Sequence, residues 1–170
     1  MKYKSIIRNL ILVLSSCFLT LGVQTSSTHE ADSPTYTNKT TVTRITAKDL
    51  NDNQPLLMST LIYYAITHIS DGRWIEVSDI DRGWQIQKVA VDGGIHYLVW
   101  PDKRIKNESK HIEPNWFEIN GDTVVYHSFI IHSQGYEVTN TISLKEIVNT
   151  VNTKHGIIKI NSMLENLVIV

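Results

Sequence analysis

The chain has 170 residues, with 16 lysines and arginines against 17 aspartates and glutamates and a formal net charge of −1. This near balance, without a basic cluster, gives no indication of a nucleic-acid-binding protein. The single cysteine, Cys17, lies near the amino terminus. If the leader described next is removed, no thiol remains for a disulfide, a nucleophile or a metal site.

The first 25 residues have the pattern of a secretory signal peptide. Lys2, Lys4 and Arg8 form a positively charged start, and the apolar run Leu10–Val23 follows it. The run is short for a membrane span, which needs about 20 apolar residues. We therefore expect residues 1–25 to be removed on export. The domain is then expected to be secreted or to lie at the extracellular face of the cell envelope.

Cys17 leaves an alternative for this leader open. Leu14-Ser15-Ser16-Cys17 resembles the lipobox of bacterial lipoproteins, in which the cysteine carries lipid. However, Phe18–Val23 stays apolar, where a lipoprotein normally becomes polar. Cleavage near Thr25 is the preferred prediction, and lipid attachment at Cys17 is the alternative.

Residues 26–44 are rich in threonine, serine and asparagine and contain few apolar groups. Such a segment cannot bury enough surface to offset the entropy that is lost when it becomes ordered. The composition predicts a flexible polar spacer over 26–44 and a single folded domain over 45–170.

The folded domain is expected to be organised around a helix over Gln54–Ile69. Pro55 suits the first helical position, and Asp52 or Asn53 can cap the free amides. The segment is apolar nearly all the way round, which predicts a buried helix. Its length of about 22 Å is too short to cross a bilayer.

Segments of alternating polarity follow this helix and predict an antiparallel meander of five or six strands. Asp92-Gly93-Gly94 and Asn120-Gly121-Asp122 indicate hairpin turns, because glycine supplies the positive φ that such turns need. Residues 102–114 are charged and irregular and are expected to form a loop. The predicted strands are Arg73–Val77, Gly83–Val91, Ile95–Trp100, Asn115–Ile119, Thr123–His132 and Tyr136–Ser143.

The chain is expected to end in helical structure. Ser143 and Glu146 fit a capping box at a helix start, and Lys154-His155-Gly156 fits the end of the same helix. A short helix near Ile160–Asn166 and an extended Leu167–Val170 are expected after it. The predicted class is α+β, with a curled antiparallel sheet of five to six strands packed on the buried N-terminal helix and a C-terminal helical segment.

No sequence motif specifies a catalytic or metal site. The seven histidines include no His-x-His or His-x-x-x-His, so we predict no metal site and no cofactor. Gly-x-Ser-x-Gly and phosphate-binding glycine loops do not occur in the sequence either. Because a Ser/His/Asp site is assembled in space, an extracytoplasmic hydrolase stays open as an alternative, with no catalytic residue that can be named.

The four tryptophans are the candidate ligand-binding residues. Trp74, Trp84, Trp100 and Trp116 all lie in the predicted strand region. An exposed tryptophan can stack on a sugar ring, but the pattern favours core packing for such large side chains, with ligand binding as the alternative. Trp84 and Trp100 are the predicted binding residues if any of these rings is exposed.

Four features follow one another in the sequence: the leader and spacer, LLMSTLIYYAITH at Leu56–His68, the Gly121–Val124 hairpin, and Thr141–Asn152. This succession resembles a family of small exported proteins and lipoproteins of unknown function from lactic-acid bacteria. The likeness covers Ile45 to the end, and the family carries no catalytic residues that could be transferred.

The expected function is therefore that of a non-enzymatic binding module at the cell envelope. The expected ligand is a cell-wall glycan or another envelope protein, and membrane contact would come only through the signal or a lipid anchor. A structural or inhibitory partner protein is a third hypothesis. It predicts an exposed apolar patch near Leu167–Val170.

Overall fold

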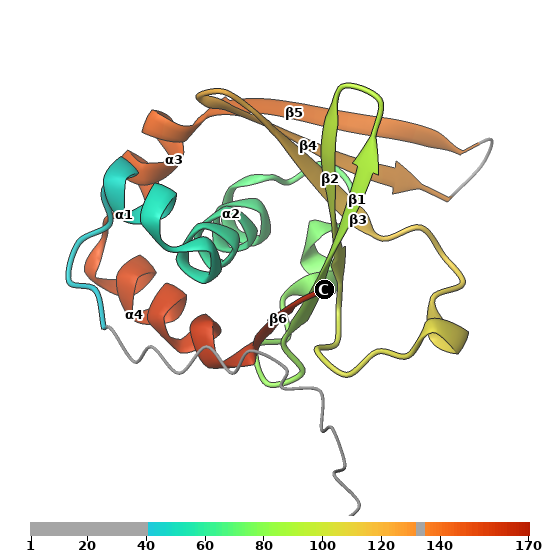
Figure 1. Ribbon diagram of the computed structural model, residues 1–170, viewed down its shortest axis with the longest axis horizontal. Coiled ribbons are helices and arrows are strands. Elements are labelled where there is room, and N and C mark those ends of the chain that lie inside the picture. Colours follow the sequence, from blue (N-terminus) through green and yellow to red (C-terminus); the bar gives the residue numbers. More distant parts are fainter. Residues whose placement is uncertain (1–40, 132–134) are drawn as a thin grey trace, which may run out of the picture. The chain divides into compact units, whose positions relative to one another are not determined.

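The computed structural model describes residues 41–131 and 135–170, which form a mixed α and β structure with one open six-stranded sheet (Figure 1). The α+β class is confirmed, and the six observed strands agree with the predicted five to six, but the prediction of a wholly antiparallel sheet is wrong, because the last strand pairs in parallel. The predicted signal peptide over 1–25, which includes Cys17, and residues 26–40 of the predicted 26–44 spacer lie outside the described residues. In the described part, no helix is long and apolar enough to cross a membrane.

The sheet has the strand order β5-β4-β3-β2-β1-β6. The first five strands form an antiparallel meander, and β6 pairs in parallel with β1 at the far edge. The strands are β1 (Trp84–Val91), β2 (Gly94–Trp100), β3 (Asn115–Asn120), β4 (Thr123–Ile130), β5 (Tyr136–Ser143) and β6 (Leu167–Ile169).

Both predicted hairpin turns are confirmed. Gly93 has a φ of 95° between β1 and β2, and Gly121 has a φ of 60° between β3 and β4. These are left-handed conformations that favour glycine.

The predicted buried helix is confirmed as α2 (Gln54–His68). Asn53 caps it, since its Oδ1 accepts a hydrogen bond from the Leu56 amide at 3.0 Å. A short helix that was not predicted, α1 (Ala47–Asp52), precedes it. On the sheet side, the Tyr126 hydroxyl donates to the Leu61 carbonyl at 3.1 Å, which joins β4 to α2 inside the core.

The prediction of a strand at Arg73–Val77 is wrong. Residues Trp74–Val77 form the 3₁₀ helix η1. The Arg73 guanidinium binds the carboxylate of Glu76, three residues later, at 2.8 Å. This spacing brings two side chains together on a helical turn and sends them to opposite faces of a strand.

The predicted end of the C-terminal helix is also wrong. Helix α3 (Leu144–Val151) begins at Ser143 as expected, with the Ser143 hydroxyl accepting from the Glu146 amide at 3.2 Å. Lys154, however, begins a new helix, α4 (Lys154–Met163), which continues into the 3₁₀ helix η3 (Leu164–Asn166). Thr153 caps α4 by accepting from the Gly156 amide at 2.9 Å.

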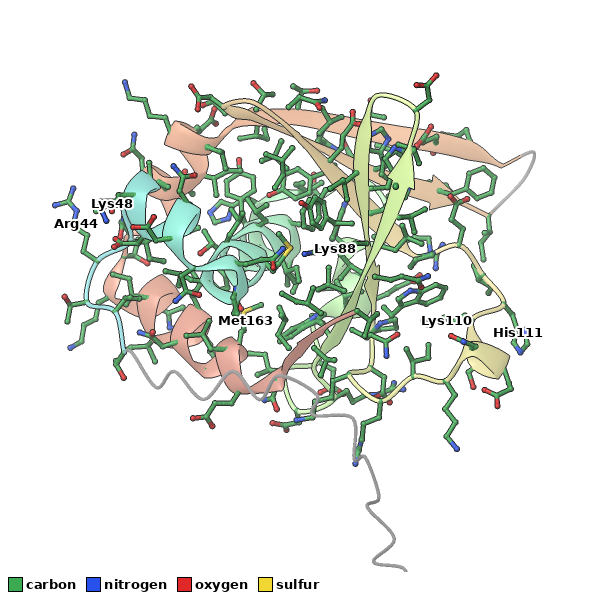
Figure 2. The ribbon with its side chains drawn as sticks, in the orientation of Figure 1. Arg44, Lys48, Lys88, Lys110, His111 and Met163 are labelled. Atoms are coloured by element: carbon green, nitrogen blue, oxygen red, sulfur yellow. The ribbon has the colours of Figure 1, made fainter. Side chains whose placement is uncertain are left out.

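The four α-helices gather on one face of the sheet (Figure 1). Met163 points from α4 into the buried region between helices and sheet (Figure 2). The fully buried core joins both layers. Its members include Leu56, Met58, Leu61, Ile62, Trp74, Trp84, Ile86, Val99, Phe117, Val124, Tyr126, Ile147, Val151 and Ile160.

Two asparagine side chains hold the segment that leads into α1. Asn152 accepts from the Ile45 amide at 2.9 Å and donates to the Ile45 carbonyl at 2.7 Å. Asn161 binds the amide and carbonyl of Val42 in the same way, at 3.1 and 2.8 Å. Val42 belongs to the segment predicted as a spacer, so fixed contacts to the domain begin before residue 45.

Candidate functional site

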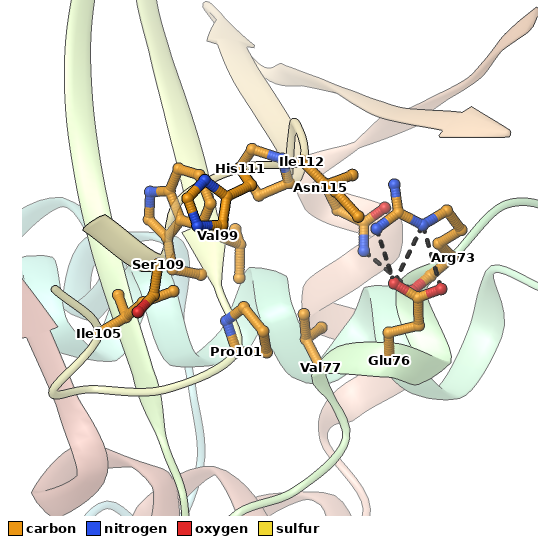
Figure 3. Close-up of a pocket in the computed structure, with 12 residues that line it drawn as sticks. Arg73, Glu76, Val77, Val99, Pro101, Ile105, Ser109, His111, Ile112 and Asn115 are labelled. Atoms are coloured by element: carbon orange, nitrogen blue, oxygen red, sulfur yellow. Dashed lines mark hydrogen bonds and ion pairs between the residues drawn. The ribbon is translucent and has the colours of Figure 1, made fainter. Parts of the chain in front are cut away.

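A pocket of about 280 Å³ lies at the Trp100–Asn115 end of β2 and β3 (Figure 3). Its walls come from η1, from the ends of these two strands, and from the segment 101–114 that connects them. This segment includes the 3₁₀ helix η2 (Asn107–Ser109). The lining residues are Arg73, Glu76, Val77, Val99, Trp100, Pro101, Ile105, Ser109, His111, Ile112, Pro114 and Asn115.

The apolar wall of the pocket is built on the paired ends of β2 and β3. Val99 pairs with Asn115 across these strands, and Pro101 and Pro114 turn the chain away from the sheet on either side. Ile105 and Ile112 close the wall from the connecting segment. Ile112 is 54% exposed and therefore presents an apolar group at the mouth.

Trp100 is held by a polar contact on its edge. Its Nε1 donates to Oε1 of Gln87 at 3.1 Å, and Nζ of Lys110 donates to the same oxygen at 3.1 Å. This places the Lys110 ammonium 5.1 Å from the indole centroid, which is within cation–π range. Lys110 and His111 extend from the connecting segment on the opposite side of the sheet from the helices (Figure 2).

The charged group in the pocket wall is already paired. Nη2 of Arg73 lies 2.8 Å from the Glu76 carboxylate, and its Nε donates to both carboxylate oxygens at 3.0 Å. Nη1 donates to the carbonyl oxygens of Glu113 and Phe129, at 3.3 and 3.2 Å. Because the guanidinium is already bound by protein oxygens, Arg73 joins the segments that form this wall and is not available to bind an anionic ligand.

A buried polar network supports this wall from behind. The Arg73 amide donates to the Ser128 hydroxyl at 2.7 Å, and that hydroxyl donates to Oδ1 of Asn115 at 2.7 Å. Nδ2 of Asn115 donates a hydrogen bond to the Arg73 carbonyl at 2.9 Å. Asn115 and Ser128 are 2% and 1% exposed, so each of these bonds replaces contact with water. The network fixes the start of η1 against β3 and β4.

The two tryptophans predicted to bind ligand have different surroundings. Trp84 is fully buried and its Nε1 donates to the Val77 carbonyl at 2.7 Å, so no ring face is free for a ligand. Trp84 was predicted to bind a ligand only on the condition that its ring is exposed, and this condition is not met, because the side chain points into the layer between sheet and helices. Trp100 is only 7% exposed, but it contributes to the pocket wall.

The other two tryptophans do not offer a free ring face either. Trp74 is 1% exposed. Trp116 is half-buried and lies between two imidazoles, with ring centroids 3.9 Å from His96 and 3.5 Å from His127. Both faces of its indole are therefore covered, and a sugar ring cannot stack on it without displacing a histidine.

Carboxylates flank this stack of rings. Nδ1 of His127 lies 2.7 Å from the Glu137 carboxylate, while Nε2 of His96 and of His127 lie 3.9 and 4.0 Å from Glu118. Within the described part of the chain, no group of three or more such side chains is placed to hold a metal ion.

The histidine contacts bear on the hydrolase alternative. In residues 41–131 and 135–170, side-chain hydrogen bonds join His68 to Thr67 and His127 to Glu137, and none joins a histidine to a serine. Ser109 and His111 both line the pocket, without a bond between them in this part of the chain. The described geometry therefore supplies no serine nucleophile with an adjacent base.

Sequence reasoning missed most of this pocket. Ile105, Ser109, His111 and Ile112 lie in a segment that was expected to be an irregular loop, and η1 was expected to be a strand. The available signal was the pair of isoleucines, Ile105 and Ile112, inside an otherwise charged stretch. No family model, curated protein or solved structure matches the chain.

Proposed function

We propose that this chain is a non-enzymatic binding module exported to the cell envelope, and that its pocket binds an apolar side chain of a protein partner. The pocket wall carries the proposal. Six of its lining side chains are aliphatic or proline: Val77, Val99, Pro101, Ile105, Ile112 and Pro114. The positive charge of Arg73 beside them is paired with the carboxylate of Glu76.

The size of the pocket favours a single side chain over an oligosaccharide. Small-molecule sites usually enclose about 300–1,000 Å³, and this pocket, at about 280 Å³, lies just below that range. Glycan binding also relies on open aromatic faces, whereas the described tryptophans are buried or covered. The protein version of the expected function is therefore favoured over the glycan version.

The buried helix and the sheet supply the support that such a site needs. In the proposed architecture, the sheet curls over α2, and the pocket opens at the Trp100–Asn115 end of β2 and β3. The Tyr126–Leu61 hydrogen bond and the shared core support this arrangement. Export is supported by the leader pattern of residues 1–25 and agrees with the resemblance to exported proteins.

Side-chain mimics test the pocket directly. N-acetyl-leucinamide and N-acetyl-tryptophanamide should shift the backbone NMR signals of Lys110, His111 and Ile112, whereas chitotriose should not. Ile112→Asp should weaken this binding about fivefold or more, because it puts a charge at the apolar mouth. Ile158→Asp is the matched control, since Ile158 is 57% exposed on α4 and does not line the pocket.

Shifts with chitotriose alone would replace the protein version with the glycan version, and no response to any probe would refute a binding role for this pocket. Export needs a separate measurement. Mass spectrometry of the chain recovered outside the cell should find a new amino terminus near Thr25. A diacylated Cys17 at the new terminus would instead identify a lipoprotein, and an intact leader would contradict processing.

A further inference from the structure

The strand β5 is an edge strand that lacks the usual protection against pairing. All eight of its residues pair with β4, from Ser143 opposite Thr123 to Tyr136 opposite Ile130, without a bulge. Within the described residues, no strand pairs with its other side. Natural edges are commonly blocked by charged side chains, above all lysine, by proline, by a bulge or by short length. β5 has no lysine, proline or bulge, and its one charge, Glu137, is engaged by His127, whereas β6 at the opposite edge has only three residues.

The register shows which backbone groups of β5 are free to pair. The Leu144 amide donates to the Asp122 carbonyl at 2.8 Å, so Ser143 and Thr123 form a non-hydrogen-bonded pair of the antiparallel ladder. Because the pattern alternates, the backbone N–H and C=O groups of Glu137, Thr139, Thr141 and Ser143 point away from β4. These groups form a regular row of donors and acceptors along the edge.

The side chains of β5 are nearly palindromic about Asn140. The central sequence is Val138-Thr139-Asn140-Thr141-Ile142. If two copies of this strand pair antiparallel with Asn140 opposite Asn140, then each Thr139 faces a Thr141 and each Val138 faces an Ile142. Apolar groups then meet apolar groups, hydroxyls meet hydroxyls, and the two amides meet on the two-fold axis.

The same register also keeps the charges apart. Glu137 is the only charged residue of β5, and it would face Ser143 of the second copy. Its carboxylate is already engaged by His127 at 2.7 Å. A shift of the register by two residues would instead place Val138 opposite Asn140, an apolar group against a polar one. The sequence therefore matches one antiparallel register best.

We propose that β5 is a self-association surface, through which two copies of this chain pair antiparallel about Asn140 into one continuous sheet. The contact is isologous, so it closes at a dimer and leaves no further β5 edge open. It uses the outward-pointing backbone groups of Glu137, Thr139, Thr141 and Ser143 and does not involve the proposed pocket. The pocket can fail as a binding site without affecting this proposal.

Cysteine cross-linking tests the register. In the full-length chain with Cys17→Ser, purified in nonionic detergent, Asn140→Cys should form a disulfide-linked dimer under mild oxidation, because the two β-carbons face each other across a non-hydrogen-bonded pair. Glu137→Cys is the matched control. Its two copies would lie six residues apart along the strands, about 20 Å, and should not cross-link.

Light scattering over a concentration series tests the edge itself. Thr139→Lys should raise the dimer dissociation constant at least tenfold, because it places a charge on the free edge. Val168→Lys, on the opposite edge strand, should leave the constant unchanged. Any one of three results would overturn the proposal: equal cross-linking of the two cysteine variants, an unchanged dimer dissociation constant for Thr139→Lys, or a monomeric protein at about 0.5 mM. Pairing of β5 with a strand from another protein would not rescue it.

Discussion

Replacing Ser128 with alanine should test the buried network behind the pocket most sharply. The Ser128 hydroxyl accepts from the Arg73 amide and donates to Oδ1 of Asn115, both at 2.7 Å, and it is 1% exposed. Ser128→Ala removes both bonds and leaves the partly buried Arg73 N–H and the buried Asn115 Oδ1 without these partners. Each unsatisfied buried group costs about 1–3 kcal/mol. Because the Arg73 N–H is only partly buried, we expect a total loss at the low end for two such groups, about 2–3 kcal/mol in the free energy of unfolding.

Urea denaturation measures this loss. With a slope of about 1.5 kcal/mol per molar urea, the midpoint should fall by about 1.3–2 M at an unchanged slope. Ser70→Ala, at an exposed serine, is the control and should stay within about 0.5 kcal/mol of the wild type. Asn115→Ala should be less harmful in the Ser128→Ala background than in the wild type, because the two residues share one bond. A midpoint for Ser128→Ala equal to that of the control, or strict additivity of the two substitutions, would refute the role given to this network.

Three other predictions concern the core, the turns and the effect of pH on stability. Thr60→Val should be neutral or stabilise by about 1 kcal/mol in urea denaturation, because the Thr60 hydroxyl is buried without a partner; a loss above about 1 kcal/mol would show an unrecognised bond. Gly83→Ala should destabilise by about 2 kcal/mol or more, because Gly83 has a φ of 69° and an added β-carbon would lie 2.1 Å from the Asn166 carbonyl oxygen. Gly121→Ala, with a similar φ and open space, should cost about 1 kcal/mol in the same thermal or urea measurement, and equal losses would contradict the steric argument. Burial raises the pKa of the Tyr126 hydroxyl well above its ordinary value of about 10. Above pH 10 the unfolded chain therefore loses the Tyr126 proton while the folded chain keeps it, so the free energy of unfolding should be retained below pH 10 and fall as the pH rises above 10. Tyr126→Phe should make this alkaline fall shallower in denaturation curves between pH 9 and 11, and a slope identical to that of the wild type would exclude Tyr126 as its source.

The parts of the fold that depend on local chemistry could be predicted from the sequence. Asn53 and Pro55 mark the start of α2, and Gly93 and Gly121 mark the tight turns between β1 and β2 and between β3 and β4. These signals act over a few residues and need no tertiary context. The long apolar run of α2 likewise needs only burial, which any compact domain provides.

Where a segment is too short or its local signal fits two structures, the sequence alone could not decide between them. Trp74–Val77 has four residues, too few for periodicity to separate a strand from a 3₁₀ turn. Gly156 was interpreted as a helix end, but it lies in the first turn of α4, where an added β-carbon would be 2.3 Å from the Val151 carbonyl oxygen. A glycine required for close approach and a glycine required for a left-handed cap are identical in sequence.

The candidate pocket depended on tertiary structure throughout. Arg73 and Ile112 line it from segments that are far apart in the chain, and the exposure of Trp84 and Trp100 depends on which layers cover their strands. Alternation within a strand divides residues between two faces, but it does not state which face is covered. Of the four candidate tryptophans, Trp100 alone lies in the pocket wall.

The side chains of Asn152 and Asn161, which bind the segment ahead of α1, determine how mechanical load would enter this domain. Tension applied to the chain ahead of Thr41 would first reach the Val42–Asn161 pair and then the Ile45–Asn152 pair. It would pass from there into α4 and the C-terminal end of α3, while the ladders of the sheet stay outside its route. A surface-anchored copy under shear would therefore yield at its helical side first and keep its strands aligned.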